Sequence, residues 1–489
     1  MFERAELDPA IDEEEYERRE LALRTELLQR QYELLEKRDR AVLVVVAGID
    51  GAGKGSTINL LNEWMDPRHI RTQAFGEPTP EEAQRPAMWR YWNALPARGQ
   101  SGIVFDAWYT PLLKEAARKS PDMERILAMA ARIRRFEAML AAERVRIVKL
   151  WYHLSRRAQI ARIDEQLADP ATAWRVSEAD LRVRKRFKRL RAAGRIVLEA
   201  TQAPHASWRV VPGADARLRT VETASAVLDA LAGPLPAVAR RAPPPAVALR
   251  RHRRLAMAPR PGGGKLDGDA YEKRLASYQA QLAEHARSKR FQQRSLVLVF
   301  EGVDAAGKGG AIRRVAHALD VRHFRIVPVS APTGEERAYP YLWRFWRQLP
   351  LHGRVCMFDR SWYGRVLVER VDALITPAAW RRAYAEINDF EDQLVRSGAL
   401  VLKFWLSVSR DEQLRRFRER RESPFKSFKL TPDDWRNRRK WGEYMDAARD
   451  MVARTDTLHA PWFIVAHDDK RTARLQVLEH IVQALDDLK

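Results

Sequence analysis

The amino-acid sequence contains one domain-sized pattern twice. Aligned with itself at an offset of 254 residues, the chain matches over most of its length in a single register. The matching pairs include Lys54 with Lys308, Pro78 with Pro332, Trp92 with Trp346, Lys149 with Lys403 and His205 with His459. A repeat of this size indicates two copies of a whole domain, because solenoid repeats are only about 20–50 residues long.

The domain boundaries follow from the repeat and from local composition. We expect an N-terminal domain over 1–235, a linker over 236–265 and a C-terminal domain over 266–489. The linker is rich in Pro, Gly and Arg and has little hydrophobic periodicity, which is typical of connecting segments.

Each half has the element order of an α/β domain. A charged helical stretch comes first, at 11–38 and 269–293, and a short apolar strand follows, at 41–47 and 295–300. Short apolar runs that lead straight into glycine are typical of buried parallel strands. Later strands end at Asp106 and Asp359 or cover 147–154 and 400–408. We therefore predict two tandem α/β domains, each with a doubly wound parallel sheet flanked by helices.

The loop after the first strand has the composition of a phosphate-binding loop. It reads GIDGAGKGS at 48–56 and GVDAAGKGG at 302–310. Glycines let backbone N–H groups point at phosphate oxygens, and the lysine reaches the outer phosphates. The usual Mg²⁺-binding Ser or Thr is absent, because Gly309 follows Lys308. We predict that two carboxylates, Asp304 in the loop and Asp359 at a neighbouring strand end, hold Mg²⁺ instead.

Basic side chains near this loop complete the predicted site. Arg360 follows Asp359 and could neutralise charge on a transferring phosphoryl group. The stretch 410–440 has 12 Lys/Arg against 6 Asp/Glu, and two prolines break it into a mobile basic hairpin. The predicted catalytic residues are Asp304, Lys308, Asp359 and Arg360. The predicted phosphate-binding residues are Gly302, Ala305, Ala306, Gly307, Gly309, Gly310, Arg365, Arg416, Lys426 and Lys429. Glu369 and Arg370 are the predicted nucleotide-binding residues, while Trp362 and Tyr363 are expected to be core or positioning residues.

Three motifs in this order resemble the polyphosphate kinase 2 family. They are GVDAAGKGG (302–310), FDRSWYGR (358–365) and PFKSFKLTP (424–432). The resemblance covers both halves, and the tandem arrangement is similar to the family's two-domain members. With the loop and the basic segment, it implies two tandem P-loop kinase-like domains, each with a basic helical lid. It also implies Mg²⁺-dependent transfer of a phosphoryl group from inorganic polyphosphate to AMP, giving ADP, and assembly into a homo-oligomer.

The N-terminal half departs from this pattern. Its segment FDAWY (105–109) aligns with FDRSWY if one residue is missing, so that Asp106 matches Asp359 and no arginine follows. At the lid, Thr172 stands for Lys426 and Arg175 for Lys429. Losing a transition-state arginine costs orders of magnitude in rate. We therefore predict that the C-terminal half does the chemistry and that the N-terminal half is a structural or polyphosphate-docking domain.

Net charge and cysteine content limit the partners. The formal charge of +22 indicates a polyanion: nucleic acid, an anionic membrane or a phosphate-rich substrate. An arginine-rich coding bias is the other explanation. The chain has one cysteine, Cys356, no signal peptide and no apolar run near the ~18 residues of a membrane helix. We expect a soluble cytoplasmic protein whose partners are polyphosphate and AMP or ADP, with no membrane or nucleic acid.

Three other functions stay open at this point. The motifs also suit phosphorylation of ADP or GDP to the triphosphate. An ATP-dependent nucleoside monophosphate kinase would need an adenine-binding element on the donor side, which the sequence does not reveal. A nucleic-acid-binding P-loop protein would need exposed aromatic residues among the basic ones.

Overall fold

The computed structural model describes residues 1–176, 178–235, 247–250, 257–259, 266–424 and 427–488. The chain divides into two compact units. The N-terminal unit comprises Met1–Pro78, Arg90–Ala239 and Thr333–Trp343, and the C-terminal unit comprises Thr79–Trp89, Arg240–Pro332 and Arg344–Lys489. Each unit thus includes a short segment of the other half, taken from matching positions of the repeat. Most of the predicted linker 236–265 lies outside the described residues.

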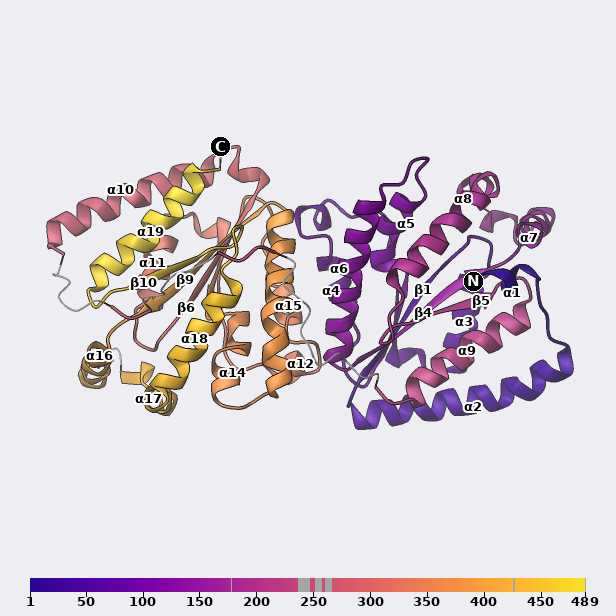
Figure 1. The fold of residues 1–489 in the computed structure, drawn as a ribbon, viewed down its shortest axis with the longest axis horizontal. Helices are drawn as coiled ribbons and strands as arrows, with labels where there is room; N and C mark the ends of the chain where they lie inside the picture. The colour runs from indigo at the N-terminus through magenta and orange to yellow at the C-terminus, as the bar shows by residue number, and fades with distance from the viewer. Residues whose placement is uncertain (177, 236–246, 251–256, 260–265, 425–426, 489) are drawn as a thin grey trace. The chain divides into compact units, whose positions relative to one another are not determined.

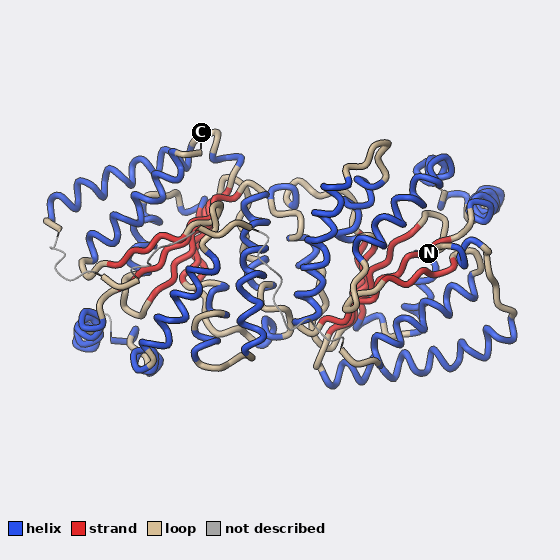
Figure 2. The backbone as a smooth tube through the Cα atoms, viewed as in Figure 1, coloured by secondary structure: helices blue, strands red, loops and turns tan. Residues whose placement is uncertain are grey.

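Each unit is built on one five-stranded parallel sheet (Figures 1 and 2). The N-terminal sheet has the order β2-β3-β1-β4-β5 and the C-terminal sheet the matching order β7-β8-β6-β9-β10. The N-terminal strands are β1 (Ala41–Gly48), β2 (Ile70–Ala74), β3 (Ser101–Phe105), β4 (Val145–His153) and β5 (Trp208–Pro212). The C-terminal strands are β6 (Ser295–Gly302), β7 (Phe324–Pro328), β8 (Val355–Asp359), β9 (Ala399–Ser407) and β10 (Trp462–Ala466).

Helices cover both faces of each sheet. Those of the N-terminal half are α1 (Glu3–Glu6), α2 (Glu13–Lys37), α3 (Lys54–Trp64), α4 (Trp89–Asn93), α5 (Thr110–Ala116), α6 (Met123–Ala142), α7 (Arg156–Ala168), α8 (Glu178–Thr201) and α9 (Ala216–Ala232). Those of the C-terminal half are α10 (Gly268–Arg287), α11 (Lys308–His317), α12 (Gly334–Arg337), α13 (Trp343–Trp346), α14 (Val368–Val371), α15 (Pro377–Arg396), α16 (Arg410–Glu422), α17 (Pro432–Arg439), α18 (Trp441–Thr455) and α19 (Lys470–Asp486). In the N-terminal unit α2, α3 and α9 pack together on one face, and α5, α6 and α8 on the other (Figure 1).

The predicted doubly wound α/β fold is confirmed. The long first helices, the central strands and the broken basic segment formed by α16 and α17 lie where the sequence placed them. The sequence analysis missed the outer strands, β2 and β5 in one unit and β7 and β10 in the other. Their burial is incomplete, so they lack the continuous apolar run that marks a central strand. Among the described residues, no helix is long and apolar enough to span a membrane.

The predicted one-residue gap near Asp106 is wrong. In the N-terminal sheet Phe105 pairs with Val46, and in the C-terminal sheet Asp359 pairs with Phe300, the residue that matches Val46. The 254-residue offset therefore continues unbroken through this segment. Phe105 takes the position of Asp359, and Asp106 takes the position of Arg360. The shared FD dipeptide misled the alignment because it invites a shift of one residue.

A buried lysine anchors the same network in both units. Lys403 on β9 donates to Glu391 Oε2 at 2.7 Å, to the Tyr363 hydroxyl at 3.0 Å and to the Thr455 carbonyl at 2.7 Å. Glu391 Oε1 also accepts from the indole of Trp362 at 3.0 Å. The N-terminal unit repeats these bonds with Lys149, Glu137, Tyr109, Thr201 and Trp108. Since the network persists where the residues around it changed, it supports the fold, and Trp362 and Tyr363 are core residues as predicted.

Candidate active site in the C-terminal unit

The phosphate-binding loop joins the central strand β6 to helix α11. Gly302 ends the strand with φ of 142°, and a Cβ there would lie 1.9 Å from the carbonyl oxygen of Leu406. Gly307 caps α11 with φ of 110°. Only glycine fits the first position, and the second favours it. The loop thus presents the N-terminus of a ten-residue helix, whose first N–H groups lack intrahelical acceptors, at the carboxyl edge of the sheet.

Lys308 lies at the start of α11 and folds back over the loop. Its Nζ donates to the carbonyl oxygens of Gly302 at 2.7 Å and Val303 at 3.2 Å. Burial lowers the pKa of Lys308, while the nearby carboxylate of Asp304 acts in the opposite direction. These weak neutral acceptors can be exchanged for phosphate oxygens, so the ammonium group is available to a bound polyanion.

Asp304 is the point at which the loop meets two other elements. Its Oδ1 accepts from Arg360 Nη2 at 2.9 Å, and its Oδ2 accepts from Asn437 Nδ2 at 2.7 Å. Its backbone carbonyl accepts from Gln413 at 3.0 Å. The structure therefore brings the predicted Asp304 and Arg360 together and adds Asn437, from the lid helix α17, which the sequence analysis missed. Nothing in the spacing of Asn437 marks it, because its contact depends on how α17 folds over the loop.

Asp359 ends β8 and differs from Asp304 in its partners. Its side chain accepts no hydrogen bond and forms no ion pair with any described residue, yet it lies close enough to influence the charge of Lys308. Mg²⁺ usually takes one or two protein carboxylates and completes its shell with water and substrate phosphates. No group of three or more His, Cys, Asp or Glu able to hold a metal occurs in the described part of the chain. Asp359, whose carboxylate has no partner among the described residues, lies beside the hydrogen-bonded Asp304. This pair suits a metal ion that is also bound by a phosphate ligand.

Two further polar residues of this site were not predicted. Glu301, the residue before Gly302, is buried and accepts from Ser361 Oγ at 2.7 Å. Burial raises the pKa of Glu301, with Ser361 acting in the opposite direction. Burial also raises the pKa of Tyr444 on α18, and the charges of Glu301 and Asp304 add to this effect. Glu301 was hidden in the apolar run of its strand, although a lone acid inside such a run is itself a signal.

The remaining predicted residues lie in different settings. Arg416 is buried behind the loop, where it donates to the carbonyls of Ala305 at 2.9 Å and Ala306 at 3.2 Å, so it supports the loop backbone. Arg365 pairs with Glu369 at 3.0 Å. Arg370 pairs with Asp450 at 2.8 Å and stacks on Trp380. Lys426 lies outside the described residues, and of Lys429 only the backbone, in a 3₁₀ turn over Ser427–Lys429, is described. Gly309 and Gly310 form the first turn of α11, where Gly310 donates to the carbonyl of Gly307 at 2.9 Å.

The N-terminal loop has the same backbone but different surroundings. Lys54 donates to Gly48 O and to Asp50 Oδ1, both at 2.9 Å, so here the lysine pairs with the loop aspartate. The C-terminal residues Glu301, Asp359, Arg360, Ser361, Asn437 and Tyr444 correspond to Ala47, Phe105, Asp106, Ala107, Val183 and Leu190. These six polar side chains near Asp304 and Lys308 are thus replaced, while the loop, its hydrogen bond from Gln413 or Gln159 and the buried lysine network remain.

Known proteins similar to this chain match both halves of its repeat. A family model described as Polyphosphate kinase 2 matches residues 10–237 and again 265–489. A protein named polyphosphate:AMP phosphotransferase from Pseudomonas aeruginosa strain PAO1 is 46% identical over 493 residues, which cover 99% of both chains. A crystal structure described as polyphosphate kinase 2 from Pseudomonas aeruginosa PA01 superimposes with a TM-score of 0.87 at 44% identity, covering 100% of this chain and 99% of that one. A GDP-polyphosphate phosphotransferase from Mycobacterium tuberculosis is 38% identical over 226 residues, 46% of this chain and 77% of its own.

Proposed function

The chain belongs to the polyphosphate kinase 2 family, and from that premise we propose that it transfers a phosphoryl group from inorganic polyphosphate to AMP, giving ADP. The proposal places the reaction in the C-terminal domain, 266–489, and assigns no catalysis to the N-terminal domain, 1–235. AMP as the acceptor is supported by the relative named polyphosphate:AMP phosphotransferase, which aligns with 99% of this chain and 99% of its own length. The relative named for a GDP acceptor matches less than half of the chain.

One observation carries the assignment to the C-terminal unit. Beside Lys308, Asp304 binds both Arg360 and Asn437, and Asp359 faces the same charges with no partner among the described residues. This arrangement supplies what phosphoryl transfer requires: positive charge where phosphate oxygens lie and open carboxylate oxygens for a metal. The N-terminal loop has Phe105 and Asp106 at two of these positions.

The reaction needs positioning more than acid–base catalysis. An oxygen of the AMP phosphate attacks the terminal phosphorus of polyphosphate, and the bond from that phosphorus to its bridging oxygen breaks. The shortened polymer leaves with the negative charge on that oxygen. A phosphate monoester has its second pKa near 6, so the attacking oxygen is already ionised at neutral pH. No side chain has to remove a proton.

The residues divide this work between them. Backbone N–H groups at the start of α11 and the ammonium of Lys308 would bind the end of the polymer. Arg360 would stabilise the charge that develops as the bridging bond breaks. Mg²⁺, held by Asp359 and Asp304, would neutralise phosphate oxygens when bound. Lys426 and Lys429 of the lid are proposed to cover the polymer, and Asn437 would fix the lid against Asp304.

Chromatographic separation of nucleotides tests the reaction. The purified chain, Mg²⁺ and polyphosphate are incubated with AMP or with ADP, and ATP replaces polyphosphate in a control. We expect ADP from AMP and polyphosphate. Formation of ATP from ADP alone would instead assign a diphosphate acceptor, and turnover with ATP but not polyphosphate would overturn the donor. Chelation of Mg²⁺ with EDTA should stop the reaction, and added Mg²⁺ should restore it.

The remaining parts of the proposal concern partners and location. The charge of +22 suits a long polyanionic substrate and gives no reason to expect nucleic acid once that substrate is assigned. A homo-oligomer and a cytoplasmic location are part of the same proposal, and sedimentation of the purified chain tests the first.

A further inference from the structure

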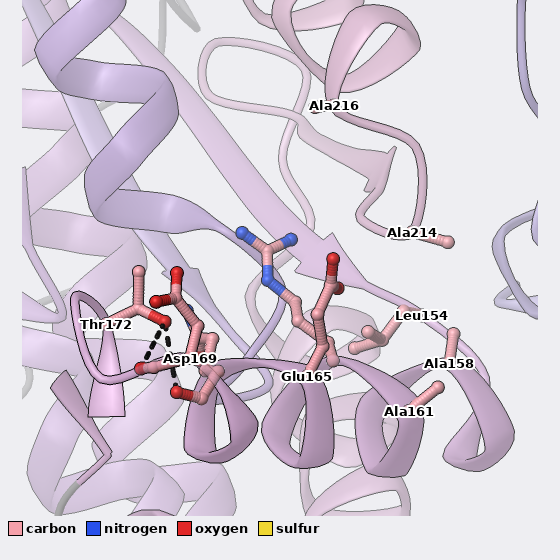
Figure 3. A pocket seen from close by; sticks show the side chains of 10 residues that line it. Leu154, Ala158, Ala161, Glu165, Asp169, Thr172, Ala214 and Ala216 are labelled. Atoms are coloured by element: carbon pink, nitrogen blue, oxygen red, sulfur yellow. Dashed lines mark hydrogen bonds between the residues drawn. The ribbon is translucent and has the colours of Figure 1, made fainter.

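The N-terminal unit contains a cavity that the proposed reaction does not use. It has a volume of about 510 Å³, within the 300–1,000 Å³ typical of small-molecule sites. Its walls come from α7, from Leu154 after β4, and from Ala214 and Ala216 at the start of α9 (Figure 3). The cavity therefore lies at the carboxyl ends of two adjacent parallel strands, where open α/β sheets bind ligands.

The cavity exists because four charged side chains of the C-terminal unit are alanines here. Glu412, Arg415, Asp468 and Lys470 correspond to Ala158, Ala161, Ala214 and Ala216. In the C-terminal unit Glu412 pairs with both Arg415 and Arg416 at 2.6 Å. The loss of these four side chains leaves a space in which alanine methyl groups form part of the wall.

Arg162 in the cavity wall does not support the phosphate loop as its C-terminal counterpart does. The C-terminal Arg416 holds loop carbonyls, but the matching Arg162 makes no hydrogen bond or ion pair with any described residue. Arg219, which replaces Ala473, packs against the N-terminal loop instead. It donates to Thr57 Oγ1 at 2.7 Å and to Gly213 O at 2.8 Å. Burial, and then the charge of Arg162, lower the pKa of Arg219 to about 10. The two guanidinium groups thus repel each other. Glu165 acts on Arg162 and Asp215 on Arg219 in the opposite direction, but neither carboxylate forms an ion pair with them in the described residues, and a bound anion would relieve the repulsion.

The phosphate loop contacts residues that are next in sequence to two of the cavity-lining alanines, Ala158 and Ala214. Gln159 of α7 donates to the carbonyl of Asp50 at 2.8 Å, and Gly213 packs so closely on the loop that a Cβ there would lie 2.9 Å from Ala52. A ligand with a flat apolar group in the alanine-walled part could bind Arg162 and extend its phosphates past Gln159 to the loop. Glu165 and Asp169 also line the cavity. These carboxylates would repel a bare phosphate chain but can accept hydrogen bonds from sugar hydroxyls.

We propose that the N-terminal unit binds a nucleoside diphosphate or triphosphate, with its base in the alanine-walled cavity and its phosphates on the loop at Gly51–Lys54. The site is separate from the acceptor site of the C-terminal unit and does not depend on the reaction proposed for that unit. It gives the non-catalytic copy a ligand of its own, through which nucleotide level could be sensed.

Photoaffinity labelling of the full chain with 8-azido-ADP tests this directly, because the azide sits on the base. Peptide mapping should find label within 154–172 or 208–218. Excess ADP should suppress this label at least tenfold better than the same concentration of inorganic pyrophosphate. The variant Ala161→Arg, which restores the side chain of the matching position, should lose at least nine-tenths of the label. Ala158→Glu is a second variant of the same kind, and an unchanged melting temperature shows that each folds.

Three results would overturn the proposal. One is label confined to the C-terminal half, which would leave the reaction there intact. Another is label in the N-terminal half that neither variant reduces. The third is equal displacement by pyrophosphate and ADP, which would show that the loop takes only a phosphate group.

Discussion

Asp106 and Arg360 occupy the same position in two copies of one fold. The backbone N–H of each donates to the central strand, Asp106 to Val46 O at 2.8 Å and Arg360 to Phe300 O at 3.0 Å. Both have a positive φ, of 57° and 65°. One strand end thus places a guanidinium against Asp304 in the C-terminal unit and a carboxylate near Lys54 in the other. The charge facing the phosphate loop has been reversed, while the backbone has been kept.

Replacing Arg360 by Ala should reduce ADP formation about 10³-fold or more. An arginine that stabilises a transferring phosphoryl group contributes 10³–10⁵ in rate, and Arg360 also orients Asp304. The matched variant Asp106→Ala should leave kcat within about twofold of the parent. Steady-state kinetics with AMP and polyphosphate compare the two. A larger loss from Asp106→Ala than from Arg360→Ala would contradict the assignment of roles to the two units.

Replacing Asn437 by Ala should lower kcat/KM by about tenfold. Its hydrogen bond to Asp304 joins the lid helix to the loop, and a bond to a charged group contributes roughly 1.5–3 kcal/mol. Asn437→Asp should cost more, because it sets a second carboxylate against Asp304. If both variants keep the parent kinetics, the contact between α17 and the loop has no part in the active arrangement.

The buried lysine networks should matter for folding in both units alike. Removing one partner of a buried ion pair costs about 3–5 kcal/mol, because the other charge remains buried. Glu391→Ala should therefore destabilise the C-terminal unit, and Glu137→Ala the N-terminal unit, by similar amounts. Urea unfolding monitored by tryptophan fluorescence measures both. A network used only for catalysis would give loss of turnover in Glu391→Ala with no shift of the unfolding midpoint.

Cys356, the only cysteine of the chain, should be nearly inert in the native state. It is 1% exposed on β8, and burial raises the pKa of its thiol to about 12. At pH 8 only about 10⁻⁴ of it would be the reactive thiolate. Because this pKa is raised, the reaction rate should keep rising with pH beyond 9 instead of levelling there. A thiol reagent should modify the native chain slowly and the urea-unfolded chain at once; fast native modification would show that β8 is open to solvent.

The sequence predicts much of this molecule because its strongest signals are local. The apolar runs of β1 and β6, the glycines of the loop and the prolines that bound the lid each fix backbone structure within a few residues. The repeat then transfers every assignment to the second half. The fold and the backbone of the phosphate loop could therefore be predicted.

The site's other contacts depend on tertiary geometry and could not be predicted this way. Asn437 meets Asp304 across 133 residues of chain, and Glu301 meets Ser361 across 60. The alignment at Asp106 failed for a related reason, since a matching dipeptide outweighed a register that only sheet pairing reveals. The cavity beside α7 arises from four alanines that are scattered in sequence and meet only in space.

The central claim is that one of two similar phosphate loops does the chemistry, and the paired variants Lys308→Ala and Lys54→Ala test it most directly. The two lysines stand at identical positions of the repeat and make the same bond to a strand-end glycine. ADP formation from AMP and polyphosphate is measured for both, with melting temperature as the control for folding. The account predicts that Lys308→Ala abolishes turnover while Lys54→Ala keeps most of it. The reverse pattern, or equal loss in both, would contradict the account.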